Sequence, residues 1–449
     1  MLKQKTPSEI AYRVVERLTQ AGHESYWAGG CVRDRLLGRT PKDYDVATAA
    51  TPDQIEALFD KTLPIGKAFG MIAVIEERVQ IDVTTFRSDV NYSDGRHPQQ
   101  IQFTTAKEDV LRRDFTINGM LYNPLNDQLI DYVDGEADLQ QGVIRAIGDA
   151  KSRFQEDHLR MLRAVRFAHT LGFRLSPSTR DAIRSHADKI TKVSAERIEQ
   201  ELSRLLTESQ TPGQALKNLD ETGLLPHILP EVSALKGVEQ SPKSHPEGDV
   251  FAHTLAMLDL LPTVAPHPNF TQRELAYSVL LHDIAKPETF TQSGDPESIC
   301  FPDHEALGAR RADEILRRIR LPARERKRVV QVIAMHYLPY ISSTMSQTDV
   351  RKLIGCSEFD LLLELHRLDG ASSRGVPASY TFLCEKREAY KEEAILPDRW
   401  IDGALLLDAG YEKGARLGEL LETAYDRQLE EKEASPADLL NWLKKHYPS

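Results

Sequence analysis

The chain has 449 residues, of which 41% are hydrophobic and 28% charged, and its formal net charge is −11. This length allows two or three domains, and no apolar run approaches the ~20 residues that a membrane-spanning helix needs. The net negative charge excludes binding of nucleic acid through overall charge, so such binding would need local basic surfaces.

The first third of the chain alternates helix and strand signals. Helix starts with proline at the first helical position are predicted after Thr6 and Thr51. Strands are predicted over 25–30, 44–48, 71–76 and 79–86, the last two as a hairpin around Glu77-Arg78. Segment 87–100 is polar and rich in turn residues and is predicted to be a mobile loop. The pattern predicts a small α/β domain that ends near residue 150.

From about residue 151 onward the strand signals nearly vanish. Apolar residues at helical spacing predict one helix around Leu159–Phe167 and another around Ile198–Leu205. Turn residues over 207–248 indicate a connector and a boundary, followed by a helical unit over 249–375 and a helical tail over 381–449. Arginine-rich stretches at 151–204 and 310–328 are candidate basic surfaces, with solvated helix faces as the alternative.

Paired glycines and paired carboxylates form the first candidate site. Gly29 and Gly30 end a predicted strand, where the backbone can approach a triphosphate. Asp43 and Asp45 are two apart on the next predicted strand, so their side chains should share one face. Asp82 lies between apolar Ile81 and Val83 and is predicted to face the same site. Carboxylates so placed suit Mg²⁺, which can activate a 3′-hydroxyl and neutralise pyrophosphate.

These motifs carry a family resemblance over roughly residues 20–205. The segment Gly29 to Asp34 followed by Asp43-Tyr44-Asp45 resembles the nucleotidyltransferases of the DNA polymerase β superfamily. It is most similar to class II tRNA nucleotidyltransferases, the CCA-adding enzymes, and to the related bacterial poly(A) polymerases. The segments 112–120, 156–160 and 194–202 resemble further motifs of that family. The resemblance implies a polymerase-β-like mixed sheet in an α/β head, then an all-α neck and body.

The resemblance also implies roles for individual residues. Asp43, Asp45 and Asp82 would be catalytic, and Asp157 with Arg160 would read the Watson–Crick edge of the incoming base in place of a template. Other residues would contact the nucleotide, with Arg113 and Asp114 near the ribose. The nucleotide-binding set is Gly29, Gly30, Arg33, Arg112, Arg113, Asp114, Asn118, Asp157, Arg160, Arg163 and Arg166. CTP and ATP are the implied substrates and the 3′ acceptor end of tRNA the implied partner.

Base reading by Asp157 and Arg160 is also plausible chemically. A carboxylate accepts from the exocyclic amino group of C or A, whereas U and G present a carbonyl there. The two residues are three apart, which predicts one helix face. An ordinary surface ion pair is the alternative, and the neighbouring motifs argue against it.

Segment 87–98 resembles the flexible loop of family members that add the terminal A. Relatives restricted to adding two C residues have this loop shortened. Its presence favours A addition and leaves both full CCA addition and A-only addition open.

Histidines and aspartates on later predicted helices form a second candidate site. His253, the adjacent pair His282-Asp283, and Asp369 follow the order typical of the HD phosphohydrolase superfamily, which they resemble. His304 and His336 are additional candidates for a second ion or for phosphate binding, with packed core histidines as the alternative. Such ligands suit a divalent metal such as Mg, Mn or Ni. The resemblance implies phosphatase or 2′,3′-cyclic phosphodiesterase activity on RNA ends.

The predicted organisation has four parts: a head over 1–150, a neck and body over 151–240, an HD domain over 241–375 and a tail over 376–449. A poly(A) polymerase is disfavoured because basic residues do not cluster after the paired aspartates or in the tail. A pure HD phosphohydrolase whose N-terminal half only binds RNA is disfavoured by the intact aspartates. Four cysteines far apart in sequence, together with an N-terminus that lacks the apolar stretch of a signal peptide, predict a cytoplasmic protein.

Overall fold

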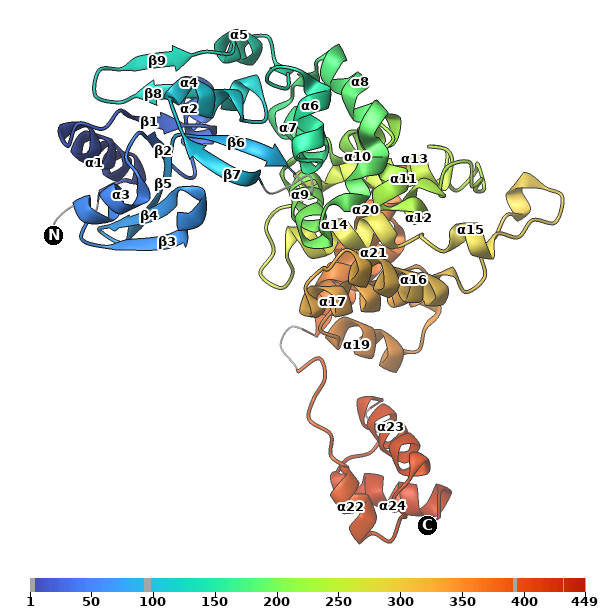
Figure 1. The fold of residues 1–449 in the computed structure, drawn as a ribbon. Helices are drawn as coiled ribbons and strands as arrows, with labels where there is room; N and C mark the ends of the chain where they lie inside the picture. The colour runs from blue at the N-terminus through green and yellow to red at the C-terminus, as the bar shows by residue number, and fades with distance from the viewer. Residues whose placement is uncertain (1–4, 93–97, 391–393, 431, 449) are drawn as a thin grey trace. The chain divides into compact units, whose positions relative to one another are not determined.

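The computed structural model describes residues 5–92, 98–390, 394–430 and 432–448. Two compact units emerge, Met1–Ser233 with Arg318–Leu321, and Ala234–Arg317 with Pro322–Ser449 (Figure 1). None of the helices in the described part of the chain combines the length and apolar composition of a membrane span.

A seven-stranded mixed sheet forms the centre of the first unit, in the order β3-β4-β5-β2-β1-β8-β9. Only β2 and β5 run parallel, and every other neighbouring pair is antiparallel. This arrangement confirms the predicted mixed sheet. The strands of the whole unit are β1 Ser25–Ala28, β2 Asp45–Thr48, β3 Thr62–Gly66, β4 Met71–Glu76, β5 Val79–Thr85, β6 Arg87–Tyr92, β7 Pro98–Phe103, β8 Met120–Asn123, β9 Gln128–Asp131, β10 Val143–Ile144 and β11 Arg174–Leu175.

Local signals placed the first elements as expected. Thr6 caps the first helix with a capping box completed by Glu9, and the helix starts with Pro7. Glu77 and Arg78 both have positive φ, 48° and 71°, which is the backbone of a two-residue hairpin turn between β4 and β5. The predicted hairpin and both helix starts are therefore confirmed.

The predicted loop over 87–100 is wrong for most of its length. Strands β6 and β7 form an antiparallel ladder, in which Arg87 pairs with Phe103 and Tyr92 with Pro98. Residues 93–97, the middle of the predicted loop, lie outside the described residues. The loop was predicted from the polar composition of the segment. Polar strands are possible here because a two-stranded ribbon need not bury a hydrophobic face in its own domain.

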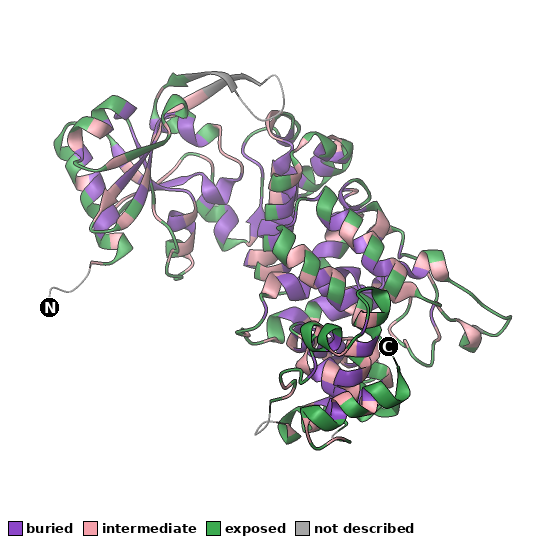
Figure 2. Ribbon diagram, turned by 90° about the horizontal axis from the view of Figure 1, so that it is seen from below, coloured by how far each residue is buried: buried purple, intermediate pink, exposed green. Residues whose placement is uncertain are grey.

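Helices surround the sheet and continue into the second half of the first unit. Buried residues, purple in Figure 2, run along the strands of the sheet and along the neighbouring helices, among them α7 and α9. The helices are α1 Pro7–Gln20, α2 Gly30–Leu36, α3 Pro52–Leu58, α4 Ala106–Leu111, α5 Gly135–Gln140, α6 Ala150–Glu156, α7 Leu159–Leu171, α8 Pro177–His186, α9 Ala195–Glu208, α10 Pro212–Glu221, α11 Leu225–Ile228 and α12 Pro230–Ser233.

The second unit is helical throughout its described residues. Helices α13, α14, α17 and α20 contact one another, and α22–α24 have their own apolar core around Leu406, Leu420 and Leu439. The helices are α13 Val250–Leu260, α14 Gln272–Leu281, α15 Lys286–Thr289, α16 His304–Arg318, α17 Ala323–Met335, α18 Leu338–Ile341, α19 Gln347–Gly355, α20 Phe359–Ser373, α21 Ala378–Ala389, α22 Gly403–Asp408, α23 Ala415–Leu429 and α24 Pro436–His446.

Candidate active sites

The pairing of β1, β2 and β5 gathers the first candidate site at one end of these strands. Asp45 opens β2 and lies opposite Asp82 of the parallel strand β5, and it also lies opposite Ala28, the last residue of β1. Registered residues on neighbouring strands point to the same face. The two carboxylates therefore share a face beside the glycine turn, as the sequence predicted for Asp82.

Asp43 differs from its predicted position. Strand β2 begins at Asp45, so Asp43 lies just before the strand rather than on it. Its negative charge nevertheless reaches Asp45. The Asp45 side chain is accessible to solvent, yet desolvation by the surrounding protein raises its pKa to about 6, and the charges of Asp82 and Asp43 add to the rise. Such crowded negative charge favours a bound cation.

Gly29 makes the turn that follows β1. Its φ is +74°, a conformation that side chains with a Cβ rarely adopt, and an added Cβ would lie 3.2 Å from Nη1 of Arg113. Gly30 starts α2 directly afterwards. The glycines thus bring the backbone close to an arginine and to the first turn of a helix; a helix at this place was predicted from the sequence, whereas the contact with Arg113 was not.

Asp109 joins the two arginines that follow α4. Its buried carboxylate accepts from Arg112 at 2.6 Å and from Arg113 at 2.9 Å. Burial alone would raise its pKa, but the charges and hydrogen bonds of Arg113 and Arg112 hold the pKa below its ordinary value. Sequence reasoning missed Asp109. The signal was present, since a carboxylate three and four residues before two arginines meets both on a helical turn.

We expect Asp109→Asn to weaken nucleotide binding and lower stability together. Breaking a fully buried ion pair costs about 3–5 kcal/mol, and here we expect about 2 kcal/mol because the arginine side chains remain 18–19% exposed. Loss of one oriented contact should raise KM for the nucleotide about tenfold, the equivalent of about 1.4 kcal/mol. Thermal unfolding and steady-state kinetics measure the two effects. An unchanged KM in a folded variant would contradict the role of Asp109 as the clamp of both arginines.

A continuous hydrogen-bonded network crosses from α2 to α7 through Asp114. Arg33 donates to Asn118 at 2.8 Å, Asn118 donates to Asp114 at 3.1 Å, and Arg163 donates to Asp114 at 2.7 Å. Burial would raise the pKa of Asp114, but the charge of Arg163 and the hydrogen bonds from Arg163 and Asn118 lower it to about 2. Its oxygens accept four N–H bonds in all. Asp114 therefore acts as the fixed centre of this network.

Glu201 of α9 extends the network to Arg166. Arg163 and Arg166 are three apart on α7 and both pair with Glu201, at 3.3 and 2.5 Å. Arg166 is 1% exposed and lies 4.1 Å from the Phe167 ring centroid. Its guanidinium is buried against the protein, so its direct contribution is to hold α7 against α9. Arg163 connects this pair to Asp114.

Asp157 and Arg160 do not share one helix, which corrects the sequence prediction. Helix α6 ends at Glu156 and α7 begins at Leu159, with Asp157 in an extended conformation between them. The Asp157 carboxylate accepts from the N–H of Leu159 at 3.1 Å, and this local bond competes with helix continuation. Asp157 thus stands at a helix break, and Arg160 lies in the first turn of the next helix.

Three elements of the second unit bring the HD residues together. His253 Nε2 lies 3.2 Å from Asp369, and His282 Nε2 lies 3.1 Å from Asp283. One possible ligand atom from each of His253, His282 and Asp283 lies within 4.8 Å of the other two. All predicted ligands of this site therefore converge, from α13, the end of α14 and α20.

His304 and His336 lie on the other side of Asp283. Their Nε2 atoms are 3.1 Å apart, and each approaches Asp283 Oδ1, at 3.6 and 3.9 Å. Burial lowers the pKa of His336 to about 4, so its imidazole is neutral, as metal coordination requires. These two histidines belong to the cluster and are not isolated core residues. Asp283 is shared by both ligand groups.

The donor atoms of the cluster fit a divalent metal. Each Nδ1 is held by a protein oxygen, for His253 by Glu247 at 2.6 Å and for His282 by Val279 at 2.9 Å, which leaves Nε2 as the ligand atom. The buried atoms His253 Nε2 and His282 Nε2 make no hydrogen bond among the described residues, and each faces a carboxylate oxygen, of Asp369 at 3.2 Å and of Asp283 at 3.1 Å. Buried polar groups without partners are costly unless a ligand completes them. Sequence reasoning missed Glu247, because it precedes the helix in a turn-rich segment.

A cavity of about 730 Å³ opens onto this cluster. Aromatic and cationic side chains join the metal ligands in its wall, among them Phe301, Tyr337, Lys286 and Arg374. Lys286 forms an ion pair with Asp283, with Nζ 2.7 Å from Oδ2, and is itself buried. The cavity therefore combines a ligand cluster with groups that can contact an aromatic, anionic molecule.

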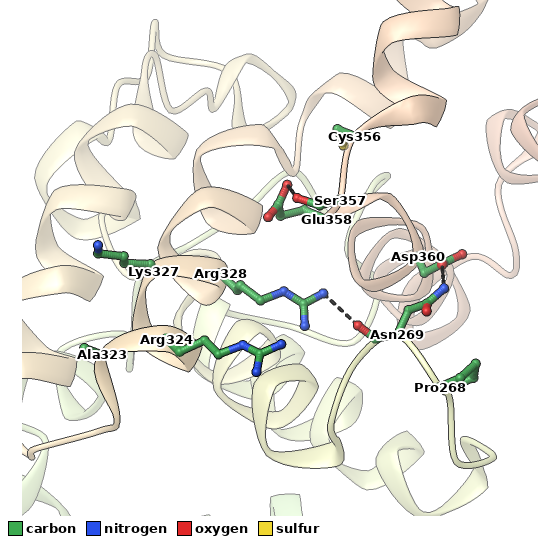
Figure 3. A pocket seen from close by; sticks show the side chains of 10 residues that line it. All are labelled: Pro268, Asn269, Ala323, Arg324, Lys327, Arg328, Cys356, Ser357, Glu358 and Asp360. Atoms are coloured by element: carbon green, nitrogen blue, oxygen red, sulfur yellow. Dashed lines mark hydrogen bonds between the residues drawn. The ribbon is translucent and has the colours of Figure 1, made fainter. Parts of the chain in front are cut away.

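A larger cavity of about 970 Å³ lies elsewhere in the second unit (Figure 3). Arg324 and Arg328 point toward it from α17, while Glu358 and Asp360 line the opposite side. Arg328 is already held by Glu274 and by the carbonyl of Asn269. None of the candidate catalytic residues lines this cavity, so its size alone assigns it no chemistry.

Family comparisons match the same three regions. The model of the poly A polymerase head domain matches residues 25–145, that of a probable RNA and SrmB-binding site of polymerase A matches 172–236, and that of the HD domain matches 250–364. The matched ranges contain the carboxylate pair and most of the HD cluster.

Known proteins of similar sequence are CCA-adding enzymes. One from Levilactobacillus brevis is 45% identical over 48% of this chain and 54% of its own length. One from Bacillus licheniformis is 36% identical over 68% of this chain and 78% of its own length. This chain spans about half the length of the first curated relatives that it matches. The crystal structure of the Bacillus stearothermophilus CCA-adding enzyme in complex with CTP has a TM-score of 0.72 and 25% identity, and covers 98% of each chain.

Proposed function

This chain belongs to the family of CCA-adding enzymes, and we propose that it adds nucleotides from CTP and ATP to the 3′ end of tRNA without a template. The observation that carries the proposal is the register of Asp45 and Asp82 beside the Gly29 turn. It places paired carboxylates next to a backbone that can receive a triphosphate.

Within the head, Asp43, Asp45 and Asp82 would hold Mg²⁺. When bound there, the ions supply Lewis acidity at the attacking and leaving oxygens. The N–H groups after Gly29 and the arginines clamped by Asp109 would receive the triphosphate. The hydrogen-bonded network around Asp114 would hold the walls of the nucleotide site in position. Its members are Arg33, Asn118, Asp114 and Arg163.

Base choice would fall to Asp157 and Arg160. Arg160 uses three N–H donors, on Glu156, the carbonyl of Arg153 and the carbonyl of Arg112. A guanidinium has five donors, so two can reach a base. The Asp157 carboxylate would accept a hydrogen bond from the amino group of C or A, which would favour CTP and ATP.

We also propose phosphohydrolase activity for the HD cluster. The Nε2 atoms without hydrogen bonds and the shared Asp283 favour two divalent ions, one among His253, His282, Asp283 and Asp369 and one among Asp283, His304 and His336. Ions bound there supply Lewis acidity for hydrolysis of a phosphoester. Phosphatase or 2′,3′-cyclic phosphodiesterase activity on RNA ends would prepare a 3′-hydroxyl for extension.

The division into head, neck and body, HD domain and tail at residues 150, 240 and 375 stays part of this proposal, as does a cytoplasmic location. An A-only enzyme and a poly(A) polymerase are the alternatives, and they differ from the proposed enzyme in product length.

The proposal is tested with purified protein, Mg²⁺ and three labelled tRNAs that end in the discriminator base, in C, or in CC. Each is offered CTP, ATP, or both, and products are resolved by length. We expect completion of CCA from all three. Addition of a single A to the CC-ending tRNA alone would indicate an A-adding enzyme, and long A tails would indicate a poly(A) polymerase. No incorporation would overturn the transferase proposal.

A further inference from the structure

A bidentate ion pair holds the carboxylate of Asp157. Arg197, in the first turn of α9, donates from Nη2 to Oδ2 at 2.7 Å and from Nη1 to Oδ1 at 3.2 Å. The N–H of Leu159 donates to Oδ1 as well. Two guanidinium donors in parallel fix both the position and the plane of a carboxylate.

This pair is neither a loose surface contact nor a core ion pair. The side chains of Arg197 and Asp157 are 24% and 20% exposed, so the pair is partly screened from water while the carboxylate stays reachable. The residues are 40 apart in sequence and belong to different elements. Asp157 stands at the break between α6 and α7, where no helix ladder fixes its side chain.

We infer that Arg197 is a positioning residue that sets base specificity by fixing the position and plane of the Asp157 carboxylate. The inference rests on the proposed function, in which Asp157 reads the base. An ionised carboxylate has about four acceptor positions and no donor. After the three bonds to Arg197 and Leu159, one position remains for the amino group of C or A.

The excluded bases follow from the same chemistry. U and G present a carbonyl where C and A present an amino group, and a carbonyl facing a fixed carboxylate leaves two acceptors opposed. Without Arg197 the carboxylate could rotate and no longer oppose that carbonyl in a fixed orientation. Arg197 therefore acts on the choice among nucleotides more than on catalysis of the transfer itself.

The test compares wild type with Arg197→Ala, Arg197→Gln and Arg197→Lys. The readout is kcat/KM for CTP, ATP, UTP and GTP, measured separately on tRNAs ending in the discriminator base and in CC. We expect the preference for CTP over UTP, and for ATP over GTP, to fall at least tenfold in the Ala and Gln variants. Arg197→Lys keeps the charge but loses the two-pronged geometry, and it should keep part of the preference.

Arg204→Ala is the matched control, because Arg204 lies on the same helix and pairs at the surface with Glu208 at 3.2 Å. It should discriminate as wild type does, and thermal unfolding verifies that all variants are folded. An equal loss of kcat/KM for all four nucleotides, or unchanged preferences in the Arg197 variants, would overturn the inference alone. If wild type adds neither C nor A, the proposed function fails and the inference fails with it.

Discussion

Replacing Asp45 with Asn is expected to lower the rate of the proposed nucleotide addition about a thousandfold while leaving the hydrolysis proposed for the HD site unchanged. The carboxylate pairs in register with Asp82 and lies beside the glycine turn. A metal ion contributes several kcal/mol of charge stabilisation in the transition state. A loss of about 4 kcal/mol corresponds to about a thousandfold in rate. Asn keeps the shape and removes the charge, so the effect should appear in kcat.

Single-turnover addition of C to a tRNA that ends in the discriminator base measures this effect. Asp53→Asn is the control, since Asp53 belongs to the same head but is 84% exposed and pairs with Lys67. We expect Asp53→Asn to react as wild type does. A folded Asp45→Asn variant that retains more than a tenth of the wild-type rate would remove Asp45 from the metal site.

Replacing Asp283 with Asn is expected to abolish phosphoester hydrolysis while nucleotide addition continues. Asp283 belongs to both groups of metal ligands, so its loss should weaken both subsites at once. Loss of the Lewis acid from such a site costs several kcal/mol of transition-state stabilisation, so we expect hydrolysis to fall at least about a thousandfold. Chelation of wild type should have the same effect, reversed by added divalent metal.

Because Asp283 is buried and pairs with Lys286, its replacement could also disturb the fold. His304→Ala provides a second variant that removes a ligand from one group only. Asp313→Asn on the outer side of α16 is the control, since Asp313 is 31% exposed and pairs with Arg317 and Arg326. Hydrolysis by folded Asp283→Asn and His304→Ala at the wild-type rate would disprove the proposed metal site. Metal content measured on each protein separates loss of binding from loss of turnover.

Sequence patterns predicted the features that depend on neighbouring residues. The capping boxes, the hairpin around Glu77-Arg78 and the helices α7 and α9 are specified within a few residues, and each was found. Strands β8 and β9 were missed. The place of β8 in the sheet depends on pairing with distant β1, and β9 joins the sheet only through β8. The hairpin of β6 and β7 was mistaken for a loop because its sequence is polar, although its two strands are neighbours in the chain.

The candidate sites show a similar division. Residues within recognisable motifs, such as Asp45 and His282-Asp283, were predicted from the sequence and lie where their clusters form. Residues that hold others in place were missed, because their partners are distant in sequence. Arg197 is 40 residues from Asp157, and Glu201 is 35 residues from Arg166. Such pairs can be identified only from the contacts in the folded structure.

The parallel pairing of β2 with β5 also restricts where residues can be inserted into or deleted from the chain. Side chains alternate between the two faces of a strand, so a shift of one residue would turn Asp82 to the opposite face from Asp45. Insertions and deletions should therefore be tolerated in the turns between Thr48 and Val79, but not within the registered residues 45–48 and 82–85. A library of single-residue deletions across 45–85, selected for tRNA maturation, would map this boundary directly.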